Sequence, residues 1–553
     1  MLWTLAVDPA RGAVTVTESP RRFPWRDLLL VLLAAAAARA LVLASGAVSF
    51  HSDEAIVGLM ARHIGQGARP VFFYGQVYMG TLDSWLVAAG FSALGESVLT
   101  IRLAQSALYL LTVLTAHLLA WRLTQRRAAA LMAGLTFALP PALVTVYTSA
   151  SLGGYGEVLL LGNLTLLLAL PPRAATGGRR RALRGLLLGL CAGLGWWVNG
   201  LMVVYLLPAA AVTAAGLLRG RTRGAFSGAA LAAAGFVVGS APWWAYDFAH
   251  DHAALRLYLG AVQSAEYAGQ AVSGAERLAG LALFGLPAAT GLRFPWATDY
   301  FAPLWGLVVL ALLALGCWRL LRTPLIAPAG RALVGGVLLT MGAAFTLSSF
   351  GADPTGRFFL PLLLPLAVGL GVLVTEILDG GPGRARRGLA AGLAALVLGY
   401  WAAGTLSAVT QPPGLTTQFT AESHIANDHD AALIAFLEAH DLARGYTHYW
   451  VAYRLAFLSG ERLQYSPALP YRADLRYNPL DDRYPPYTAA AEQAARAAYI
   501  TSGLPALDAA LAAHFAGQGV TFQRARVGPY TVYYDFAPFT PRPPRSWPPA
   551  GGG

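Results

Sequence analysis

Long apolar runs, separated by short clusters of arginine, occupy most of residues 28–408 of this chain. A run of about 18 or more apolar residues is long enough to cross a bilayer, because about 20 helical residues span its hydrocarbon core. Hydrophobic residues make up 56 % of the chain and charged residues only 12 %. That charge content is too low for several solvated domains, and the apolar content excludes a disordered chain. The sequence therefore predicts an α-helical polytopic membrane protein.

We predict about eleven transmembrane helices. The runs that define them are residues 28–48, 98–121, 128–147, 155–170, 183–198, 201–218, 225–245, 302–321, 333–349, 358–378 and 389–407. The two cysteines, Cys191 and Cys317, both lie inside such runs. We therefore expect neither a disulfide framework nor a cysteine-based metal site.

The distribution of arginine predicts the orientation. All 40 basic residues are arginine and give a net charge of +12, but they form no continuous basic domain, so we expect no nucleic-acid partner. If residues 1–27 are cytoplasmic, every arginine cluster between spans is cytoplasmic too, as the positive-inside rule requires. These clusters are Arg122/Arg126/Arg127, Arg173/Arg179/Arg180/Arg181/Arg184, Arg219/Arg221/Arg223, Arg319/Arg322/Arg331 and Arg384/Arg386/Arg387.

The same rule decides how the apolar segment 81–94 is interpreted. Counting it as a span would turn every later arginine cluster outward, so we predict an amphipathic or re-entrant helix at the outer surface. Three segments then face outward: a first loop (49–97), a middle loop (247–300) and the tail. No internal repeat is evident in the transmembrane part, residues 28–408.

The tail is not membrane-like, and we predict a small extracytoplasmic α/β domain over residues 409–540. Helical patterns occur at 430–440 and 489–498, and strand patterns at 447–451, 498–501, 520–526 and 530–535. A proline-rich terminus at 541–553 is predicted to be disordered. Because the tail has few charges that look catalytic, we expect it to bind or position an acceptor.

The pattern His51-Ser52-Asp53-Glu54 directly follows the first span. Adjacent carboxylates at a membrane interface are costly to desolvate, so they usually belong to a functional site. The alternative is a helix N-terminus, with Ser52 or Asp53 as the cap. Both interpretations stay open, and they are compatible.

The first loop continues with aromatic and polar residues that favour a groove. Tyr74, Gln76, Tyr78 and Asp83 lie close together in sequence beside Gly75 and Gly80. Aromatic residues at this depth also form the interfacial belts of membrane proteins, which is the alternative.

Single charged residues within the spans are further candidates. Arg39 lies inside the first predicted span and either pairs with a buried acid or holds a lipid phosphate. Glu157 is either a second acid of the site or an interfacial residue. His250 and His252 beside Asp247 and Asp251 are metal-ligand types, but such mixtures in a polar loop are usually solvated, and we predict no metal site.

Several motifs together resemble the PMT-type membrane glycosyltransferases of the GT-C superfamily, which include protein O-mannosyltransferases and bacterial aminoarabinose transferases. The resemblance covers the layout of residues 28–408. Its motifs are Asp53-Glu54-Ala55, the stretch from Arg69 to Gly80, Gly153-Gly154-Tyr155-Gly156-Glu157, Gly195-Trp196-Trp197-Val198-Asn199 and Gly356-Arg357-Phe358-Phe359-Leu360-Pro361.

The resemblance implies a sugar donor carried on a polyprenyl or dolichyl phosphate and transferred outside the cytoplasmic membrane. The essential aspartate of the family corresponds to Asp53. One departure concerns residues 74–78, where the aminoarabinose transferases have an acidic-Lys-Pro element and this chain has Gly75-Gln76-Val77. Phosphate contact must therefore fall to arginine, and lipid A becomes doubtful as the acceptor.

We thus predict an inverting glycosyltransferase in a bacterial inner membrane, acting on a lipid, glycan or protein acceptor. The predicted catalytic residues are Asp53, which takes the proton of the acceptor hydroxyl, and Glu54, a supporting acid. Arg357 and Arg39 are the predicted phosphate ligands, and the predicted pocket residues are His51, Tyr74, Gln76, Tyr78, Asp83 and Glu157. No cofactor or divalent metal is indicated. The rival class is a transporter or flippase of a lipid-linked glycan, and a scaffold with an inactive site is a third alternative.

Overall fold

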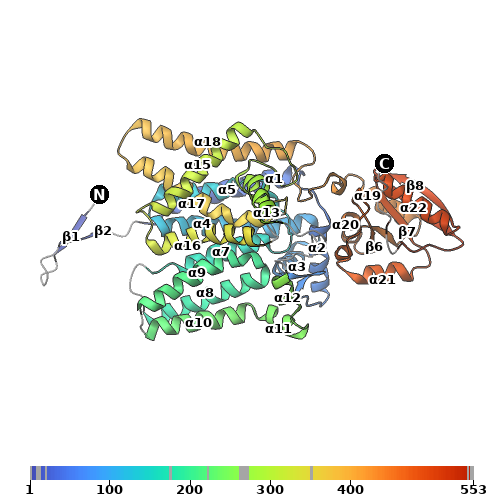
Figure 1. Cartoon of the computed structure of the whole chain (residues 1–553), viewed down its shortest axis with the longest axis horizontal. Coiled ribbons are helices and arrows are strands. Elements are labelled where there is room, and N and C mark those ends of the chain that lie inside the picture. The colour runs from blue at the N-terminus through green and yellow to red at the C-terminus, as the bar shows by residue number, and fades with distance from the viewer. Residues whose placement is uncertain are drawn as a thin grey trace.

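The computed structural model describes residues 3–7, 14–18, 22–172, 177–220, 223–260, 273–348, 353–544 and 547. These residues form an elongated helical bundle with a smaller sheet domain docked on one end (Figure 1). Near the N-terminus, β1 (Trp3–Val7) pairs antiparallel with β2 (Val14–Glu18). Arg173 and Arg221 of the predicted cytoplasmic clusters, and most of the predicted disordered terminus 541–553, lie outside the described residues.

All eleven predicted spans are helical. Nine correspond to single helical segments: α1 (Trp25–Ala44), α4 (Val98–Thr124), α7 (Tyr155–Ala169), α8 (Gly178–Val198), η1 (Gly200–Met202) with α9 (Val203–Gly220), α15 (Pro303–Arg322), α16 (Pro328–Leu347), η6 (Arg357–Leu362) with α17 (Leu363–Asp379), and α18 (Arg384–Thr410). The other two are broken, into α5 (Arg127–Ala138) and α6 (Ala142–Tyr147), and into α10 (Arg223–Gly239) and α11 (Ala241–Ala249).

The protein is a multi-pass membrane protein. Among the described residues, seven helices are long and apolar enough to cross a membrane, or eight if the bent pair α10–α11 is one span. Helices α5 and α7 fall short because they have only 12 and 15 residues, and α8 begins with four arginines in seven residues. The number eleven therefore stays a prediction.

Glycines allow the closest helix contact in the bundle, between α8 and α10. Gly185, Gly189 and Gly193 are spaced four residues apart on α8, and a Cβ on each would lie 2.2, 1.9 and 2.2 Å from a backbone atom of α10. Such small-residue spacing lets two helix backbones approach in a bilayer, where packing replaces the hydrophobic effect as the driving force.

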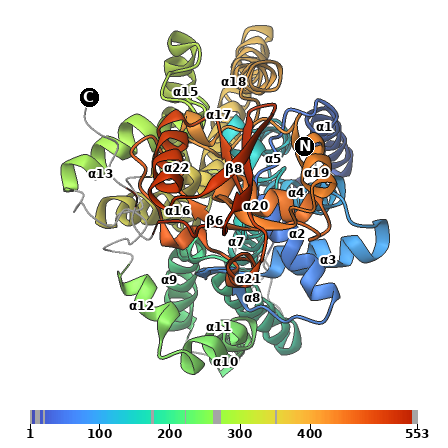
Figure 2. The ribbon, with the colours of Figure 1, turned by 90° about the vertical axis from the view of Figure 1, so that its right-hand side faces the viewer.

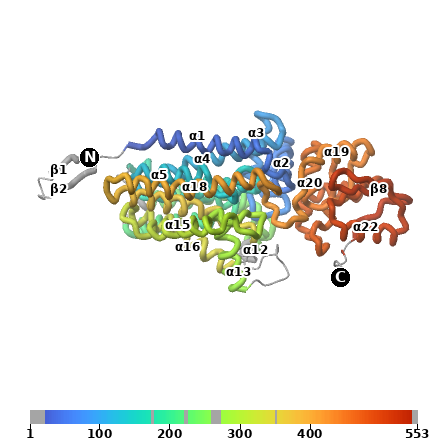
Figure 3. The backbone as a smooth tube through the Cα atoms, turned by 90° about the horizontal axis from the view of Figure 1, so that it is seen from above, coloured from blue at the N-terminus to red at the C-terminus, as the bar shows by residue number. Residues whose placement is uncertain are grey.

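Ion pairs join the helix ends at the end of the bundle away from the sheet domain. Arg126 lies 3.0 Å from Asp379, Arg127 lies 2.5 Å from Asp27, and Arg319 lies 2.7 Å from Glu376. Arginines of two predicted cytoplasmic clusters therefore share one end, and the sheet domain lies at the other (Figures 1 and 3).

The first loop lies at the end that carries the sheet domain. It contains α2 (Ser52–Gly65), a hairpin of β3 (Phe72–Phe73) and β4 (Gln76–Gly80), and α3 (Leu82–Leu94). With 13 residues, α3 is too short for an ordinary span, which agrees with the interpretation of segment 81–94. The middle loop adds α12 (Ala253–Gly260), α13 (Gly274–Gly280), η4 (Leu281–Gly285) and α14 (Leu286–Thr290).

The C-terminal domain is built on a five-stranded sheet with the order β6-β5-β7-β9-β8. Strand β5 is parallel to β6 and β7, whereas β9 is antiparallel to β7 and β8. The elements, shown end-on in Figure 2, are α19 (Asp430–Ala439), β5 (Arg444–His448), α20 (Tyr449–Leu458), β6 (Gln464–Leu469), η8 (Pro479–Asp481), α21 (Pro485–Gln493), β7 (Ala498–Ser502), α22 (Pro505–Gly517), β8 (Thr521–Val527) and β9 (Tyr530–Ala537).

Two predictions for this domain need correction. The segment 447–451 was expected to be a strand, but the strand ends at His448 and Tyr449 begins α20. The segment 489–498 was expected to be a helix, but α21 ends at Gln493 and Ala498 begins β7. Tyr449-Trp450-Val451 has a strand-like composition, and packing of α20 against α2 overrides that local preference.

Candidate active site

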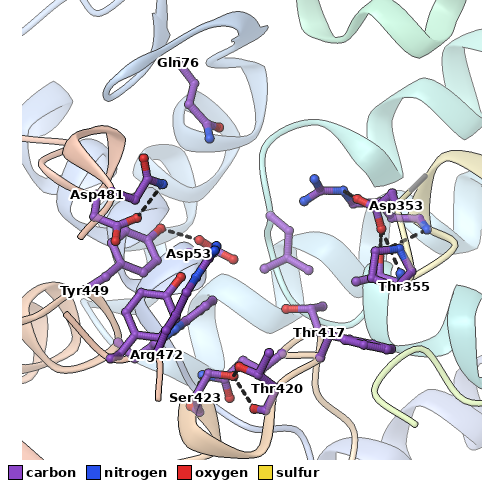
Figure 4. A pocket seen from close by; sticks show the side chains of 18 of the residues that line it. Asp53, Gln76, Asp353, Thr355, Thr417, Thr420, Ser423, Tyr449, Arg472 and Asp481 are labelled. Carbon is purple, nitrogen blue, oxygen red and sulfur yellow. Dashed lines mark hydrogen bonds and ion pairs between the residues drawn. The ribbon is translucent and has the colours of Figure 1, made fainter. Parts of the chain in front are cut away.

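A cavity of about 600 Å³ lies where the first loop, the end of the bundle and the C-terminal domain meet. Figure 4 shows Asp53, Tyr449 and Asp481 on one side of it and Asp353 and Thr355 on the other. The first loop and bundle contribute Asp53, Phe73, Gln76, Tyr78, Met79, Tyr147, Leu152, Tyr155, Asp353, Pro354, Thr355 and Arg357. The tail contributes Thr417, Gln418, Phe419, Thr420, Glu422, Ser423, Tyr449, Trp450, Tyr471, Arg472, Ala473, Asp474, Asn478, Asp481 and Arg483.

Asp53 is the carboxylate of the acidic pair that reaches the cavity. It lies in the first turn of α2, and its side chain is 34 % exposed. One carboxylate oxygen accepts a hydrogen bond from the Tyr449 hydroxyl of the C-terminal domain (Figure 4). The other lies 3.9 Å from Nδ1 of His51. A rigid helix N-terminus thus holds a partly solvated carboxylate at the cavity wall.

Glu54 points the other way, into the bundle. Its carboxylate accepts from Nε and Nη2 of Arg102 at 3.1 and 3.0 Å, and its side chain is fully buried. Arg102 also donates to the Val48 carbonyl at 3.0 Å. This buried fork joins α2 to α4 and the end of the first span, so its geometry positions Asp53 and brings no group to the cavity.

The residues around the acidic pair do not form the expected helix cap. The N-cap of α2 is His51, which makes no capping bond, and Ser52 donates to the Tyr449 carbonyl at 2.5 Å instead. Nε2 of His51 bonds the Thr417 hydroxyl at 2.9 Å. Burial lowers the pKa of His51, so the imidazole is neutral at physiological pH. The predicted helix N-terminus is present, with Asp53 and Glu54 in its first turn, but the assignment of Ser52 or Asp53 as its cap is wrong.

The structure separates the other first-loop candidates. Gln76 and Tyr78 line the cavity. Tyr74 lies in a neighbouring polar cavity, where its ring stacks on Tyr484 and its hydroxyl bonds Nδ1 of His63 at 2.8 Å. Asp83 is buried and accepts from the Gly153 N–H at 3.0 Å and the Ser151 hydroxyl at 3.2 Å.

Of the two arginines predicted to bind phosphate, Arg357 lines the cavity and Arg39 does not. Nε of Arg357 lies 2.8 Å from the Asp353 carboxylate. Arg39 is buried in the bundle, where it donates to the Thr145 carbonyl at 3.0 Å and lies 4.0 Å over the Tyr109 ring.

Glu157 is likewise buried in the bundle and accepts from Gln105 Nε2 at 2.9 Å. It is not among the residues that line the cavity. The roles predicted for Arg39, Arg357 and Glu157 stay predictions.

The sequence analysis missed the charged and aromatic residues that the C-terminal domain adds to the site. Tyr449, Arg472, Asp481 and Arg483 all line the cavity. Burial raises the pKa of Asp481 to about 7, with the charge of Asp53 acting in the same direction and those of Arg483 and Arg472 opposing it. The run Asp481-Asp482-Arg483 was a visible signal, but nothing in the sequence pointed to its proximity to Asp53.

The predicted middle-loop carboxylate Asp247 has a local role. It accepts from Nδ1 of His252 at 2.8 Å and from the Leu255 N–H at 2.9 Å. Over the part of the chain that the structure describes, no three His, Cys, Asp or Glu side chains are grouped to hold a metal ion.

Comparison with known proteins gives a match at the level of the fold. No protein-family model matches the sequence, and no curated protein sequence matches it. The structure is similar to ArnT from Cupriavidus metallidurans bound to undecaprenyl phosphate, with 14 % identity, a TM-score of 0.56 and coverage of 94 % of this chain and 100 % of that one. For the apo state of ArnT the identity is 16 % and the TM-score 0.58, and the match covers 91 % of this chain and 97 % of that one.

A third similar structure is the oligosaccharyltransferase of Archaeoglobus fulgidus in complex with Zn and sulfate. It is 10 % identical with a TM-score of 0.51, and the match covers 92 % of this chain and 72 % of that one. ArnT and the oligosaccharyltransferase are GT-C glycosyltransferases, so the predicted fold class, a GT-C-like helical membrane protein with a small C-terminal α/β domain, is confirmed.

Proposed function

We propose that this protein is an inverting glycosyltransferase that moves a sugar from a polyprenyl-phosphate donor to an acceptor hydroxyl, on the outer side of a bacterial cytoplasmic membrane. The observation that carries the proposal is the position of Asp53, a partly exposed carboxylate at the wall of a polar cavity between the bundle end and the C-terminal domain. The GT-C fold and the similarity to ArnT bound to undecaprenyl phosphate support the donor class.

In the proposed reaction Asp53 is the general base. The acceptor oxygen attacks the anomeric carbon and forms the new glycosidic bond, while its proton passes to Asp53. The bond between the anomeric carbon and the phosphate oxygen breaks with its electron pair. The lipid phosphate therefore leaves with one more negative charge, which an arginine fork stabilises.

The residues around Asp53 fit a reaction with one general base and a phosphate-binding arginine. Tyr449 orients the carboxylate through a hydrogen bond. Arg357 lines the same cavity, and as a guanidinium at the bundle end it is placed to meet a headgroup phosphate. Glu54, predicted as a supporting acid, acts in this proposal as a positioning residue through Arg102.

The cavity also favours an enzyme over the rival transporter. Transporters place their polar sites near the bilayer midplane, between helices of the bundle. Here the cavity lies at the bundle end, and the C-terminal domain forms much of its lining. The proposed acceptor is a lipid, a glycan or a protein, and the cavity leaves these three open.

Purified protein in nanodiscs tests the proposal. We expect it to convert a synthetic undecaprenyl-phosphate sugar to undecaprenyl phosphate when a solubilised cell-envelope fraction supplies acceptors, with the sugar recovered on acceptor by mass spectrometry. The Asp53→Asn variant should not. Translocation of the intact donor across liposomes without cleavage would instead support the transporter.

A further inference from the structure

Arg483 is a cation that the C-terminal domain inserts into the cavity beside Asp53. It follows η8, and its backbone N–H donates to the Tyr453 hydroxyl at 2.6 Å. The same hydroxyl accepts from the Tyr484 N–H at 3.1 Å. Tyr453 is fully buried, so the core of the domain fixes the backbone from which the Arg483 side chain projects.

The first loop holds the other end of this side chain. With the Gln76 amide oriented to satisfy both groups, its oxygen accepts from Nη1 and Nη2 of Arg483 at 2.7 and 2.6 Å. The Gly75 carbonyl lies 3.5 Å from Nη1. Gly75 has φ +70°, and a Cβ there would lie 3.0 Å from Cα of Arg483 and 2.9 Å from its Cδ. Only glycine fits at this contact, so the hairpin turn and Arg483 are matched to each other.

Over the residues that the structure describes, the guanidinium of Arg483 has no hydrogen-bonded carboxylate. Its partners, the Gln76 amide and the Gly75 carbonyl, are neutral. Its Nε is buried, with no hydrogen-bond partner among the described residues. Burial lowers the pKa of Arg483, but through-space interactions with Tyr449, Tyr78, Asp53 and Asp481 outweigh it and raise the pKa, so the guanidinium stays charged. Arg357 across the cavity is ion-paired with Asp353. Arg483 is only 9 % exposed and lines the cavity, so a guanidinium that stays charged there can form charge-assisted hydrogen bonds to an anion in the cavity.

The position of Arg483 relates this charge to the reacting atoms. Its guanidinium carbon lies 5.6 Å from the centre of the Tyr449 ring, and the hydroxyl of that ring donates to Asp53. Figure 4 shows Gln76 pointing toward the group formed by Asp53, Tyr449 and Asp481. An anion bound to Arg483 would therefore lie near Asp53, the proposed base.

From this geometry we infer that Arg483 binds the phosphate of the lipid-linked donor, so that the C-terminal domain completes the donor site across its junction with the first loop. The inference rests on the proposed function. It also places a donor ligand in the tail, which we had expected to position the acceptor. A cation is thereby supplied where the Tyr74–Tyr78 segment has Gln76 and no lysine.

The test compares the binding of undecaprenyl phosphate with that of uncharged undecaprenol. Wild type, Arg483→Ala, Gln76→Glu and Arg462→Ala are purified in nanodiscs, and both affinities are measured by native mass spectrometry. Arg462→Ala is the control, because Arg462 is exposed and pairs with Glu438 on the surface of the same domain. We expect wild type and Arg462→Ala to prefer the phosphate, and Arg483→Ala to lose this preference by ~10–100-fold, as for a hydrogen bond to a charged group.

Gln76→Glu separates phosphate binding from a structural role and also serves if Arg483→Ala does not fold. A carboxylate at position 76 would pair with both Nη atoms and compete with the phosphate, so we expect the preference to fall while the protein stays folded. If Arg483 has only a structural role, Gln76→Glu should keep the preference for the phosphate, and its thermal stability should be unchanged or higher. That result overturns the inference.

Two further outcomes are distinguishable. If wild type prefers the phosphate and folded Arg483→Ala keeps that preference, the inference fails and the proposed function stands, with Arg483 acting only through Asp53. If wild type itself shows no preference for the phosphate, both the donor class of the proposed function and the phosphate-binding site at Arg483 are wrong.

Discussion

The Tyr449 hydroxyl of the C-terminal domain donates a hydrogen bond to Asp53, a residue 396 positions earlier in the chain. Ser52, the neighbour of Asp53, donates in turn to the Tyr449 carbonyl at 2.5 Å. The first turn of α2 and the first turn of α20 are thus joined by two reciprocal bonds. The proposed base is therefore shaped by both domains, and its reactivity depends on their docking.

Asp53→Asn should abolish turnover and leave the binding of undecaprenyl phosphate nearly unchanged. The substitution keeps the size of the side chain and removes the base, which contributes about 10²–10⁴-fold in rate. Sugar transfer and lipid binding are measured on the same nanodisc samples. Asp299→Asn, an exposed carboxylate of the middle loop, is the matched control. Near-normal turnover in folded Asp53→Asn would rule out the proposed mechanism.

Tyr449→Phe should lower kcat by about tenfold with little change in donor affinity. The ring that packs beside Arg483 remains, but Asp53 loses a hydrogen bond of the kind that contributes about 1.5–3 kcal/mol to a charged group. Tyr533→Phe removes a comparable tyrosine–carboxylate bond, to Asp508 at 2.9 Å, elsewhere in the C-terminal domain. If the two variants lower kcat equally, the effect of Tyr449 is a general one on stability.

The apolar runs predicted the helices well because a bilayer demands about 20 apolar residues for each span, whatever lies around them. They also placed Asp53 at the bundle end, since it directly follows a span. The separate roles of Asp53 and Glu54 depend on Arg102 of α4, and no local pattern shows that partner.

The cavity residues that the C-terminal domain contributes could not be predicted from the sequence either, because they too depend on tertiary contacts. It depends on the docking of α20 against α2, where a Cβ on Gly58 would lie 2.5 Å from the Phe457 ring. Such a close approach is a property of the packed interface. The sequence shows only a glycine inside an apolar helix, which has many explanations.

Glu54→Ala should destabilise the protein by roughly 3–5 kcal/mol, because it leaves the charge of Arg102 buried without its partner. Thermal unfolding in detergent measures this loss, and the activity per folded molecule should fall far less than in Asp53→Asn. Glu96→Ala is the control, since Glu96 is 43 % exposed in its pair with Arg62 and such pairs contribute about 0–1 kcal/mol. Equal stability of the two variants would contradict a positioning role for Glu54.

Reporter fusions should place the two ends of the bundle in different compartments. A fusion after Ser407, near the end of α18 and beside the C-terminal domain, should be extracytoplasmic, and one at Arg181, near the start of α8, cytoplasmic. The physical reason is the gathering of arginines at one end, which the positive-inside rule assigns to the cytoplasm. If the two fusions report the reverse assignment, α3 crosses the membrane and the proposed orientation is wrong. If both report the same side, the seven spans predicted between Arg181 and Ser407 are miscounted.

The carboxyl of Asp481 should make stability fall as the pH rises from about 4 to about 7. Burial raises its pKa to about 7 in the folded protein, against about 3.9 for an unfolded chain. Between these values the folded state binds more protons than the unfolded state, so the free energy of unfolding decreases with rising pH, and above about pH 7 the loss is complete. Asp481→Asn cannot ionise and should escape this loss.

The melting temperatures of Asp481→Asn and wild type, measured from pH 4 to pH 9, test this directly. The difference in favour of the variant should grow up to about pH 7 and then level off, because other titrating groups cancel between the two proteins. Asp474→Asn, an exposed carboxylate of the same segment, should show no such growth. A difference that is constant with pH would mean that Asp481 is solvated and ionised throughout, and the cavity wall beside Asp53 would then be more open to water than the structure indicates.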